Sequence, residues 1–292
     1  MSGPRTIGLA QRRISNPTVE SNPHFINHNN GNAMETPRPF DLTGKVALVT
    51  GAGRGLGVSM ATELARAGAY VVPSARTTSE IEKTAACIHK AGGHAAAISG
   101  DISTRAGCRK LVQEVIDQHG RLDILVCNAA TNIFGPALEI DEDMWNGCLA
   151  TELNGYFFLA QAAVDLIMKT ARQGTIIMIG ANSSIVGYND LITVAAAKGG
   201  IDSVARNLAV EFGEFNIRVN TVNPGYTETP PEEGDVIPGY SGDLEEDIRG
   251  MTPLQRRGRI EEFAYATVFL ASDAASFITG QCLAVDGGYS IK

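Results

Sequence analysis

The sequence is poor in cysteine and contains no motif in which cysteines could act together. Its five cysteines are scattered over 292 residues, and no two of them form a CxxC pair. This pattern is typical of reduced thiols in a cytosolic protein and argues against a disulfide framework or a zinc site. We therefore predict no metal centre, and a chain this long can bury a sufficient core without one.

Long apolar runs and an excess of positive charge are also missing. No run of about 18 apolar residues occurs, so no membrane span is expected. The formal net charge is −8. Nucleic acids and anionic membranes favour basic surfaces, so neither is an expected partner. The composition, 44% hydrophobic and 19% charged, suits one ordinary globular domain.

The first part of the chain differs in composition from the rest. Residues 1–39 are rich in Asn, Pro, Ser and His and show no sustained apolar period. Such a segment cannot offset its ordering entropy, so we predict a disordered leader at 1–39 and one folded domain at 40–292. The N-terminus lacks the apolar core of a secretory signal, and we expect a cytoplasmic protein. Residues 1–19 carry three arginines and no acid, which leaves a mitochondrial transit peptide as the alternative.

Beyond residue 40, short apolar segments alternate with segments of helical periodicity. The predicted strands are 45–50, 70–74, 94–99, 122–127, 175–179, 217–222 and 281–285. The predicted helices are roughly 56–67, 79–91, 105–119, 141–170, 193–213 and 260–271. This alternation predicts an α/β fold with a single, doubly wound parallel sheet of about seven strands flanked by helices. Residues 229–251, rich in proline, glycine and acids, are predicted to form a mobile flap over a site.

A glycine-rich turn follows the first predicted strand. Residues 50–57 read TGAGRGLG, and a helical pattern follows. Glycines here permit a tight turn, let the backbone approach a pyrophosphate and let the helix pack closely on the strand. The helix N-terminus then offers free N–H groups to the phosphates. The strand before the turn and the helix after it distinguish a dinucleotide site from a purely structural turn. We therefore predict a bound nicotinamide dinucleotide.

The residues after the second strand indicate which dinucleotide this is. In NAD-binding sites an acid about 20 residues beyond the turn accepts the ribose 2′-hydroxyl. This chain has no acid between Tyr70 and Ser79, but it has Arg76. An arginine there can pair with a 2′-phosphate, and Arg54 in the turn can add a second cation. We predict NADP(H), the alternative being that Arg76 is only a solvated loop residue.

From Phe40 to the C-terminus the chain resembles the short-chain dehydrogenase/reductase family, which has a Rossmann-like fold. Residues 50–57 resemble its TGxxxGxG motif, 127–130 its NNAG segment and 223–229 its PG loop. Its C-terminal signature is matched at 252–254, 269–273, 278–281 and 285–288. The resemblance implies a small-molecule substrate. It also implies a homodimer or homotetramer, because the family's last helix and strand usually build such assemblies.

The resemblance further implies a set of cofactor-binding residues, in which Asp101 and Ile102 are the adenine-contacting pair and Lys198 bonds the nicotinamide ribose. The full set is Gly51, Arg54, Gly55, Leu56, Gly57, Arg76, Asp101, Ile102, Asn128, Ala129, Lys198, Pro224, Gly225, Thr227 and Thr229.

The family's catalytic residues are largely replaced. Members normally use an Asn–Ser–Tyr–Lys tetrad, in which the Lys makes the Tyr one helical turn earlier a better acid for proton exchange with the substrate oxygen. Lys198 is present, but Val194 stands at the Tyr position. Ala181 stands at the Ser position and Glu152 at the Asn position, all in one gapless register.

Neighbouring hydroxyls do not restore the tetrad convincingly. Ser183 and Ser184 lie just past the Ser position, and Tyr188 precedes Val194 by six residues. Thr193 is adjacent to the Tyr position, but its hydroxyl is a far poorer acid than a phenol. We expect the substrate pocket to include Ala181, Ser183, Tyr188 and Val194.

Three functions follow from this pattern. The first is an NADP(H)-dependent oxidoreductase with non-standard catalysis by Lys198 and Glu152, acting on an iminium or other activated substrate in specialised metabolism. Glu152 would stabilise a cationic substrate, supply a proton if burial raised its pKa, or simply pair with Lys198. The second is an inactive homologue that binds the cofactor as a structural or regulatory subunit. The third is an ordinary carbonyl reductase with a displaced proton donor.

Overall fold

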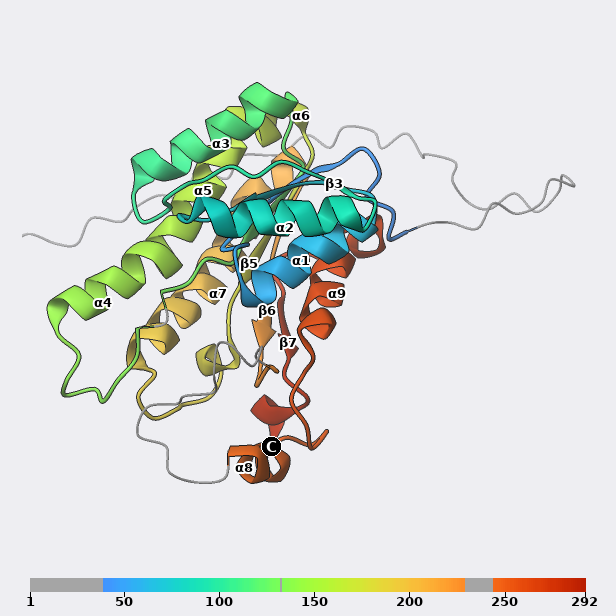
Figure 1. Cartoon of the computed structure of the whole chain (residues 1–292). Coiled ribbons are helices and arrows are strands. Elements are labelled where there is room, and N and C mark those ends of the chain that lie inside the picture. The colour runs from blue at the N-terminus through green and yellow to red at the C-terminus, as the bar shows by residue number, and fades with distance from the viewer. Residues whose placement is uncertain (1–38, 132, 229–243) are drawn as a thin grey trace, which may run out of the picture. The chain divides into compact units, whose positions relative to one another are not determined.

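The computed structural model describes residues 39–131, 133–228 and 244–292, through which a single parallel sheet runs (Figure 1). Its seven strands pair in the order β3-β2-β1-β4-β5-β6-β7, always in parallel. The strands are β1 (Val46–Thr50), β2 (Tyr70–Ser74), β3 (His94–Ala95), β4 (Ile124–Cys127), β5 (Gly174–Ile179), β6 (Ile217–Pro224) and β7 (Cys282–Val285). Strands β1, β4 and β5 are buried throughout, as their apolar sequences require. The predicted doubly wound α/β fold is confirmed.

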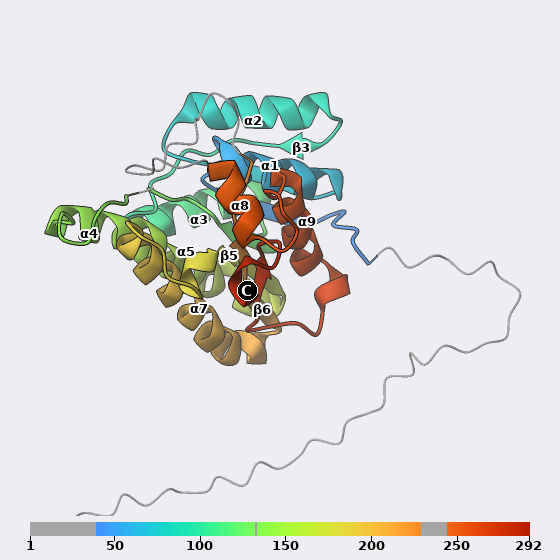
Figure 2. The ribbon, with the colours of Figure 1, turned by 90° about the horizontal axis from the view of Figure 1, so that it is seen from below.

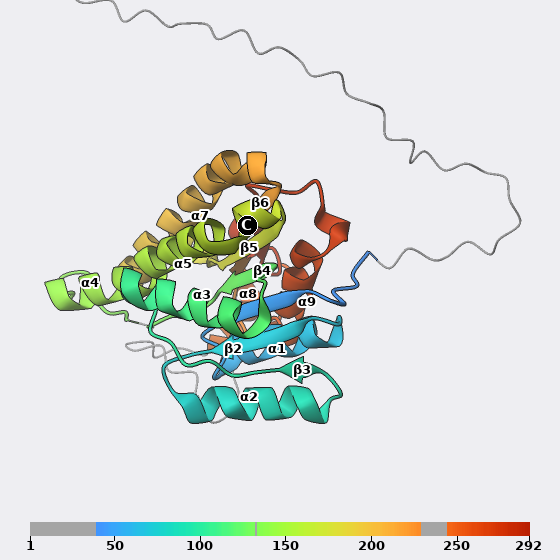
Figure 3. The ribbon, with the colours of Figure 1, turned by 90° about the horizontal axis from the view of Figure 1, so that it is seen from above.

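Helices cover both faces of the sheet, which Figures 2 and 3 show from opposite sides. One face carries α1 (Gly55–Arg66), α2 (Thr78–Lys90) and α9 (Ile260–Ala271), and the other carries α3 (Arg105–His119), α5 (Gly155–Ala163) and α7 (Ile192–Phe212). The shorter helices are α4 (Glu142–Leu149), α6 (Lys169–Ala171) and α8 (Leu244–Met251). Each face has its own hydrophobic core. Strand order reverses between β1 and β4, and ligands of such sheets bind beyond the carboxyl ends of the strands at this reversal.

Local side-chain contacts fix where several helices begin and end. The Thr104 hydroxyl accepts a hydrogen bond from the Gly107 amide at the start of α3 (3.1 Å). The Asp141 carboxylate does the same for Met144 at the start of α4 (2.8 Å). Gly120 ends α3 in the left-handed region, with a φ of 69°. These are the N-cap and C-cap residue types that stabilise helix termini.

The third strand is shorter than predicted. It comprises only His94–Ala95, although the chain continues beside β2. The amides of Ala96 and Ile98 still donate to the carbonyls of Val71 and Pro73, at 3.1 and 3.2 Å. Pro73 has no N–H with which to return a bond, so the regular ladder stops there.

The predicted flap over 229–251 needs a correction at its end. Residues 244–251 form α8, while 229–243 and nearly all of the predicted leader lie outside the described residues. Ile248 anchors α8 because its side chain is fully buried. The first turn of α8 is acidic, which suits the positive end of a helix. The last residue of the chain reaches the same helix, since Lys292 donates to the Gly250 carbonyl.

A π turn interrupts the long helical run that was predicted at 141–170. Residues Ala150–Asn154 form it between α4 and α5, and a second π turn covers Val164–Met168. Such turns hold an additional residue within a helix and are frequent at functional sites. The first of them contains Glu152, which the sequence places at the family's catalytic Asn position. None of the helices in the described ranges is long and apolar enough to cross a membrane.

Candidate cofactor cleft and active site

A cleft of about 460 Å³ lies where the sheet reverses its strand order. The glycine-rich turn after β1 forms one side of it, and residues that follow β2, β3, β4 and β6 line the rest. The lining includes most of the residues that the sequence assigns to the cofactor: Gly51, Arg54, Gly55, Leu56, Arg76, Asp101, Ile102, Asn128, Ala129 and Thr227. Their convergence in one cleft agrees with a dinucleotide site, and their contact with the cofactor stays a prediction.

The glycines of the turn are required by close backbone approaches. Gly51 has a φ of 65°, and a β-carbon there would lie 2.6 Å from the Cα of Ala129. A β-carbon at Gly57 would lie 2.2 Å from the carbonyl oxygen of Gly51. Gly57 therefore serves the packing of α1 against the turn and does not line the cleft.

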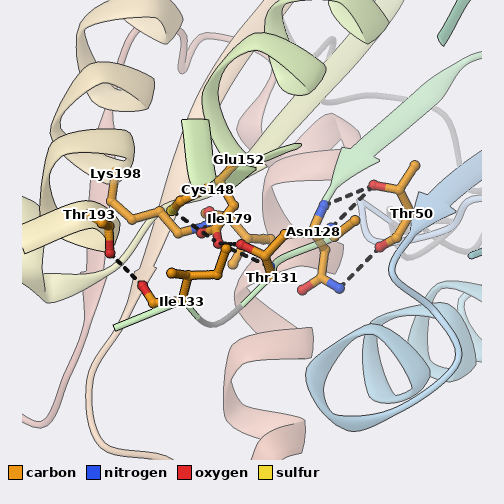
Figure 4. Close-up of polar contacts among 10 residues, drawn as sticks. Thr50, Asn128, Thr131, Ile133, Cys148, Glu152, Ile179, Thr193 and Lys198 are labelled. Atoms are coloured by element: carbon orange, nitrogen blue, oxygen red, sulfur yellow. Dashed lines mark hydrogen bonds and ion pairs between the residues drawn. The ribbon is translucent and has the colours of Figure 1, made fainter. Parts of the chain in front are cut away.

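Asn128 braces the same turn from the end of β4. Its side-chain amide donates to the carbonyls of Thr50 and Gly51, at 3.0 and 3.2 Å (Figure 4). The Thr50 hydroxyl accepts a hydrogen bond from the Asn128 backbone amide at 3.1 Å. Asn128 thus braces the turn that leads into α1, and the N–H groups at a helix N-terminus of this kind can bind an anionic group.

Positive charge in the cleft comes from Arg54 and Arg76. Both side chains are exposed, and neither forms an ion pair within the described part of the chain. Asp101 lies in the same lining, and its pKa is lowered mainly by a hydrogen bond from the Ser103 amide, with a further contribution from Arg76. The cleft therefore contains two cations that are available to an anionic group such as a phosphate.

Some predicted cofactor residues lie elsewhere, and some lining residues were not predicted. Lys198, Pro224 and Gly225 are outside the lining of this cleft, and Thr229 is outside the described residues. Sequence reasoning missed Glu80, which enters the cleft from the first turn of α2. The segment between Tyr70 and Ser79 contains no acid, and Glu80 follows directly in the first turn of α2. An acid in the first turn of the helix after β2 is the sequence signal that indicates this residue.

Glu152 and Lys198 form a buried ion pair. The Lys198 Nζ atom lies 3.1 Å from Glu152 Oε2, and the two side chains are 6% and 1% exposed. Nζ also donates to the carbonyl oxygen of Ile179 at 2.9 Å, at the end of β5. Figure 4 shows the pair between α7 and the segment after β4. One of the alternatives for Glu152, a pairing with Lys198, is therefore what the structure has.

The second carboxylate oxygen of Glu152 is occupied as well. Oε1 accepts hydrogen bonds from the Thr131 amide (3.0 Å) and hydroxyl (3.1 Å), and the Cys148 thiol lies 3.6 Å away. Burial acts to raise the pKa of Glu152, but Lys198 and Thr131 outweigh it, and the pKa is lowered. The carboxyl group is therefore ionised at neutral pH, which disfavours the alternative that it donates a proton.

This pair predicts a specific dependence of stability on pH. An unfolded glutamate has a pKa of about 4.3, and the folded-state pKa of Glu152 is lowered. The stabilisation that ionised Glu152 gives to the folded protein is therefore complete above the unfolded-state pKa of about 4.3, and it is lost as the pH falls through the folded-state pKa. Urea unfolding of wild type and Glu152→Gln between pH 7 and pH 3 should show their free energies of unfolding converging in acid. A difference that stays constant over this range would contradict the lowered pKa.

Two of the candidate substitute hydroxyls have structural partners. Thr193 donates to the carbonyl oxygen of Ile133, which ties the start of α7 to the segment after β4. Ser184 donates to Asp202 at 2.6 Å and accepts a hydrogen bond from Asn223 at 3.0 Å. Both hydroxyls are therefore engaged in holding the framework of the site.

Ser183 and Tyr188 remain in the region predicted to be the substrate pocket. The Ser183 hydroxyl is buried without a hydrogen-bond partner among the described residues. Tyr188 stacks on Tyr289 at a centroid distance of 5.5 Å, and Tyr226 meets both rings edge-on. Burial, followed by the neighbouring Tyr289, raises the pKa of Tyr188 above its usual value. Tyr188 is thus a weaker acid than an ordinary phenol, whereas the family's catalytic Tyr is a stronger one.

Comparisons with known proteins agree with this picture of an α/β protein with a dinucleotide-type cleft. A family model described as enoyl-(acyl carrier protein) reductase matches residues 51–290. A tropinone reductase homologue of Arabidopsis thaliana is 35% identical over 89% of this chain and 97% of its own length. A short-chain dehydrogenase/reductase of Pestalotiopsis microspora is 37% identical over 86% of this chain and 97% of its own. The chain belongs to the short-chain dehydrogenase/reductase family.

The similarity to a solved structure extends over the whole folded domain. The structure of a gluconate 5-dehydrogenase from Burkholderia cenocepacia, in complex with NADP and tartrate, has a TM-score of 0.82 and 31% identity. The match covers 87% of this chain and 98% of that chain.

Proposed function

We propose that the chain is an NADP(H)-dependent oxidoreductase that works without a tyrosine proton donor and acts on an iminium or similarly activated substrate. The buried Glu152–Lys198 ion pair carries the proposal. It holds Lys198 where the family has a lysine that makes a tyrosine more acidic. Val194 stands at the position of that tyrosine, one helical turn before Lys198 on α7.

The residues of the cleft fit a phosphorylated dinucleotide. The glycine turn offers backbone N–H groups at the start of α1 for the diphosphate, and Arg54 and Arg76 offer cations for a 2′-phosphate. When bound, NADP(H) supplies or accepts the hydride. The likeness to a dehydrogenase whose structure contains NADP supports this assignment.

The groups around the ion pair are poorly suited to ketone reduction. A ketone becomes an alkoxide and needs a positioned proton donor, which is worth about 10²–10⁴ in rate. Glu152 has a lowered pKa and Tyr188 a raised one, so the first has no proton to give and the second holds its proton tightly. Thr193 is committed to the carbonyl of Ile133.

An iminium substrate removes the need for such a donor. Reduction converts the cation into a neutral amine, and no proton has to be delivered. The site then has only to bind and orient its substrate. Both oxygens of Glu152 are occupied and its side chain is 1% exposed, so direct contact with a substrate cation is not favoured. Glu152 is better described as a positioning residue that fixes Lys198 and Thr131.

A turnover panel tests the proposal. We expect the full-length protein to oxidise NADPH with a cyclic iminium salt at least about 10²-fold faster than with a ketone of matched size, because only the ketone needs the missing donor. NADPH binding is measured separately by calorimetry. Tight binding without turnover of any substrate would instead support the inactive homologue. Ready reduction of simple ketones would support a carbonyl reductase with a displaced proton donor.

A further inference from the structure

A hydrogen bond from α2 to the glycine turn positions Glu80 at the cofactor cleft. The Thr84 hydroxyl, one turn later on α2, donates to the carbonyl oxygen of Ala52 in the glycine turn at 2.7 Å. Thr84 is 3% exposed, so this bond is shielded from water. The face of α2 that carries Glu80 is therefore held against the turn.

The absence of a side chain at Gly53 provides the space for Glu80. A β-carbon at Gly53 would lie 2.6 Å from Glu80 Oε2 and 2.9 Å from Glu80 Cβ. The carboxylate thus lies directly over the turn, in the same lining as Arg54 and Arg76. None of these three side chains forms a hydrogen bond or an ion pair within the described residues, and Arg76 also interacts electrostatically with Asp101 in the same lining.

We propose that Glu80 sets the cofactor preference, because its carboxylate acts on the same 2′ position as the two arginines. A carboxylate accepts a hydrogen bond from the free 2′-hydroxyl of NAD(H), as acids do in NAD sites, and repels the 2′-phosphate of NADP(H). Arg54 and Arg76 attract that phosphate. The proposal rests on the proposed function only in taking this cleft as the cofactor site.

The consequence is a cleft that accepts both dinucleotides and discriminates between them weakly. In this lining Glu80 opposes the two arginines, and the carboxylates of Asp101 and Glu228 are also present. A site with two arginines alone would favour the phosphate more strongly. Arg54 and Arg76 by themselves favour NADP(H) over NAD(H), and Glu80 reduces this preference.

Glu80→Gln tests the proposal by calorimetric titration of the full-length protein with NADPH and with NADH. We expect the variant to bind NADPH about two- to fivefold more tightly and NADH more weakly by a similar factor. The gain for NADPH should shrink as ionic strength rises, because the repulsion that it removes is screened. Glu82→Gln, an exposed change on the same helix, is the matched control and should change neither affinity.

Arg76→Ala provides a second variant with the opposite expected effect, a loss of NADPH affinity with little change for NADH. Glu80→Gln affinities that change by one common factor for both cofactors, or not at all, would overturn the role of Glu80. Binding of NADH without NADPH by the wild type would overturn the proposed NADP(H) dependence. If Glu80→Gln then weakened NADH binding, it would still support the role of Glu80.

Discussion

The Glu152→Gln variant should be less stable than the wild-type protein by about 3–5 kcal/mol at pH 7, the typical cost of removing one partner from a buried ion pair. The Lys198 side chain is 6% exposed in the wild-type protein, and an amide at position 152 leaves its ammonium group without a counter-ion. The Ile179 carbonyl still accepts a hydrogen bond from Nζ, and the centroid of the Tyr156 ring lies 5.2 Å from it, but neither group carries a compensating negative charge. Urea unfolding followed by circular dichroism gives the free energy directly.

A double-mutant cycle separates the ion pair from the packing around it. Lys198→Met should be destabilising because it leaves Glu152 charged and buried, whereas Glu152→Gln with Lys198→Met should recover much of the loss. The interaction energy from the cycle should therefore exceed the typical value of about 1 kcal/mol for an exposed pair. A smaller value would show that water reaches the pair and that Glu152 does not position Lys198.

Rebuilding the tetrad should create ketone reduction. We expect the triple variant Val194→Tyr, Ala181→Ser and Glu152→Asn to reduce a simple ketone about 10²–10⁴-fold faster than the wild type, which is the usual contribution of a positioned acid. Val194 and Ala181 are both partly exposed, so the larger side chains need not enter the packed core. Asn at 152 removes the carboxylate that now holds Lys198. The measurement is NADPH oxidation under saturating cofactor.

Two control variants test whether the gain in ketone reduction comes from the tyrosine hydroxyl and from the release of Lys198. The same triple variant with Phe in place of Tyr at position 194 has the ring but no proton and should show no gain. Val194→Tyr alone should gain less than the triple variant, because Glu152 still occupies Lys198. An equal gain from the single change would show that the ion pair does not prevent the lysine from assisting a tyrosine.

The fold follows from local sequence patterns to a large degree. Strand β2 and helices α3 and α9 begin and end at the predicted residues, because periodicity, caps and apolar runs act within a few neighbouring positions. The prediction fails where tertiary contacts decide. Pro73 shortens a neighbouring strand by failing to return a hydrogen bond, and α8 depends on the burial of Ile248. The local sequences of β3 and α8 do not indicate these tertiary contacts.

The candidate site was only partly predictable for the same reason. The glycine turn and Arg76 follow a strand directly, so their place in the cleft could be predicted from topology. The partner of Glu152 could not, because three alternatives fitted the sequence and only the geometry shows Lys198 and Thr131 on its two oxygens. Glu80 comes from a helix turn, and its approach to Gly53 depends on how α2 packs against α1.

The π turn at Ala150–Asn154 makes the identity of the residue that faces Lys198 sensitive to chain length. An α-helix advances by about 100° per residue, and a π turn differs from a regular turn by one residue. A deletion of one codon within this turn would restore a regular helix and rotate Glu152 away from α7, while the buried face of α5 could keep its place. Short insertions and deletions are therefore mutational steps that can exchange the partner of Lys198 without rebuilding the sheet.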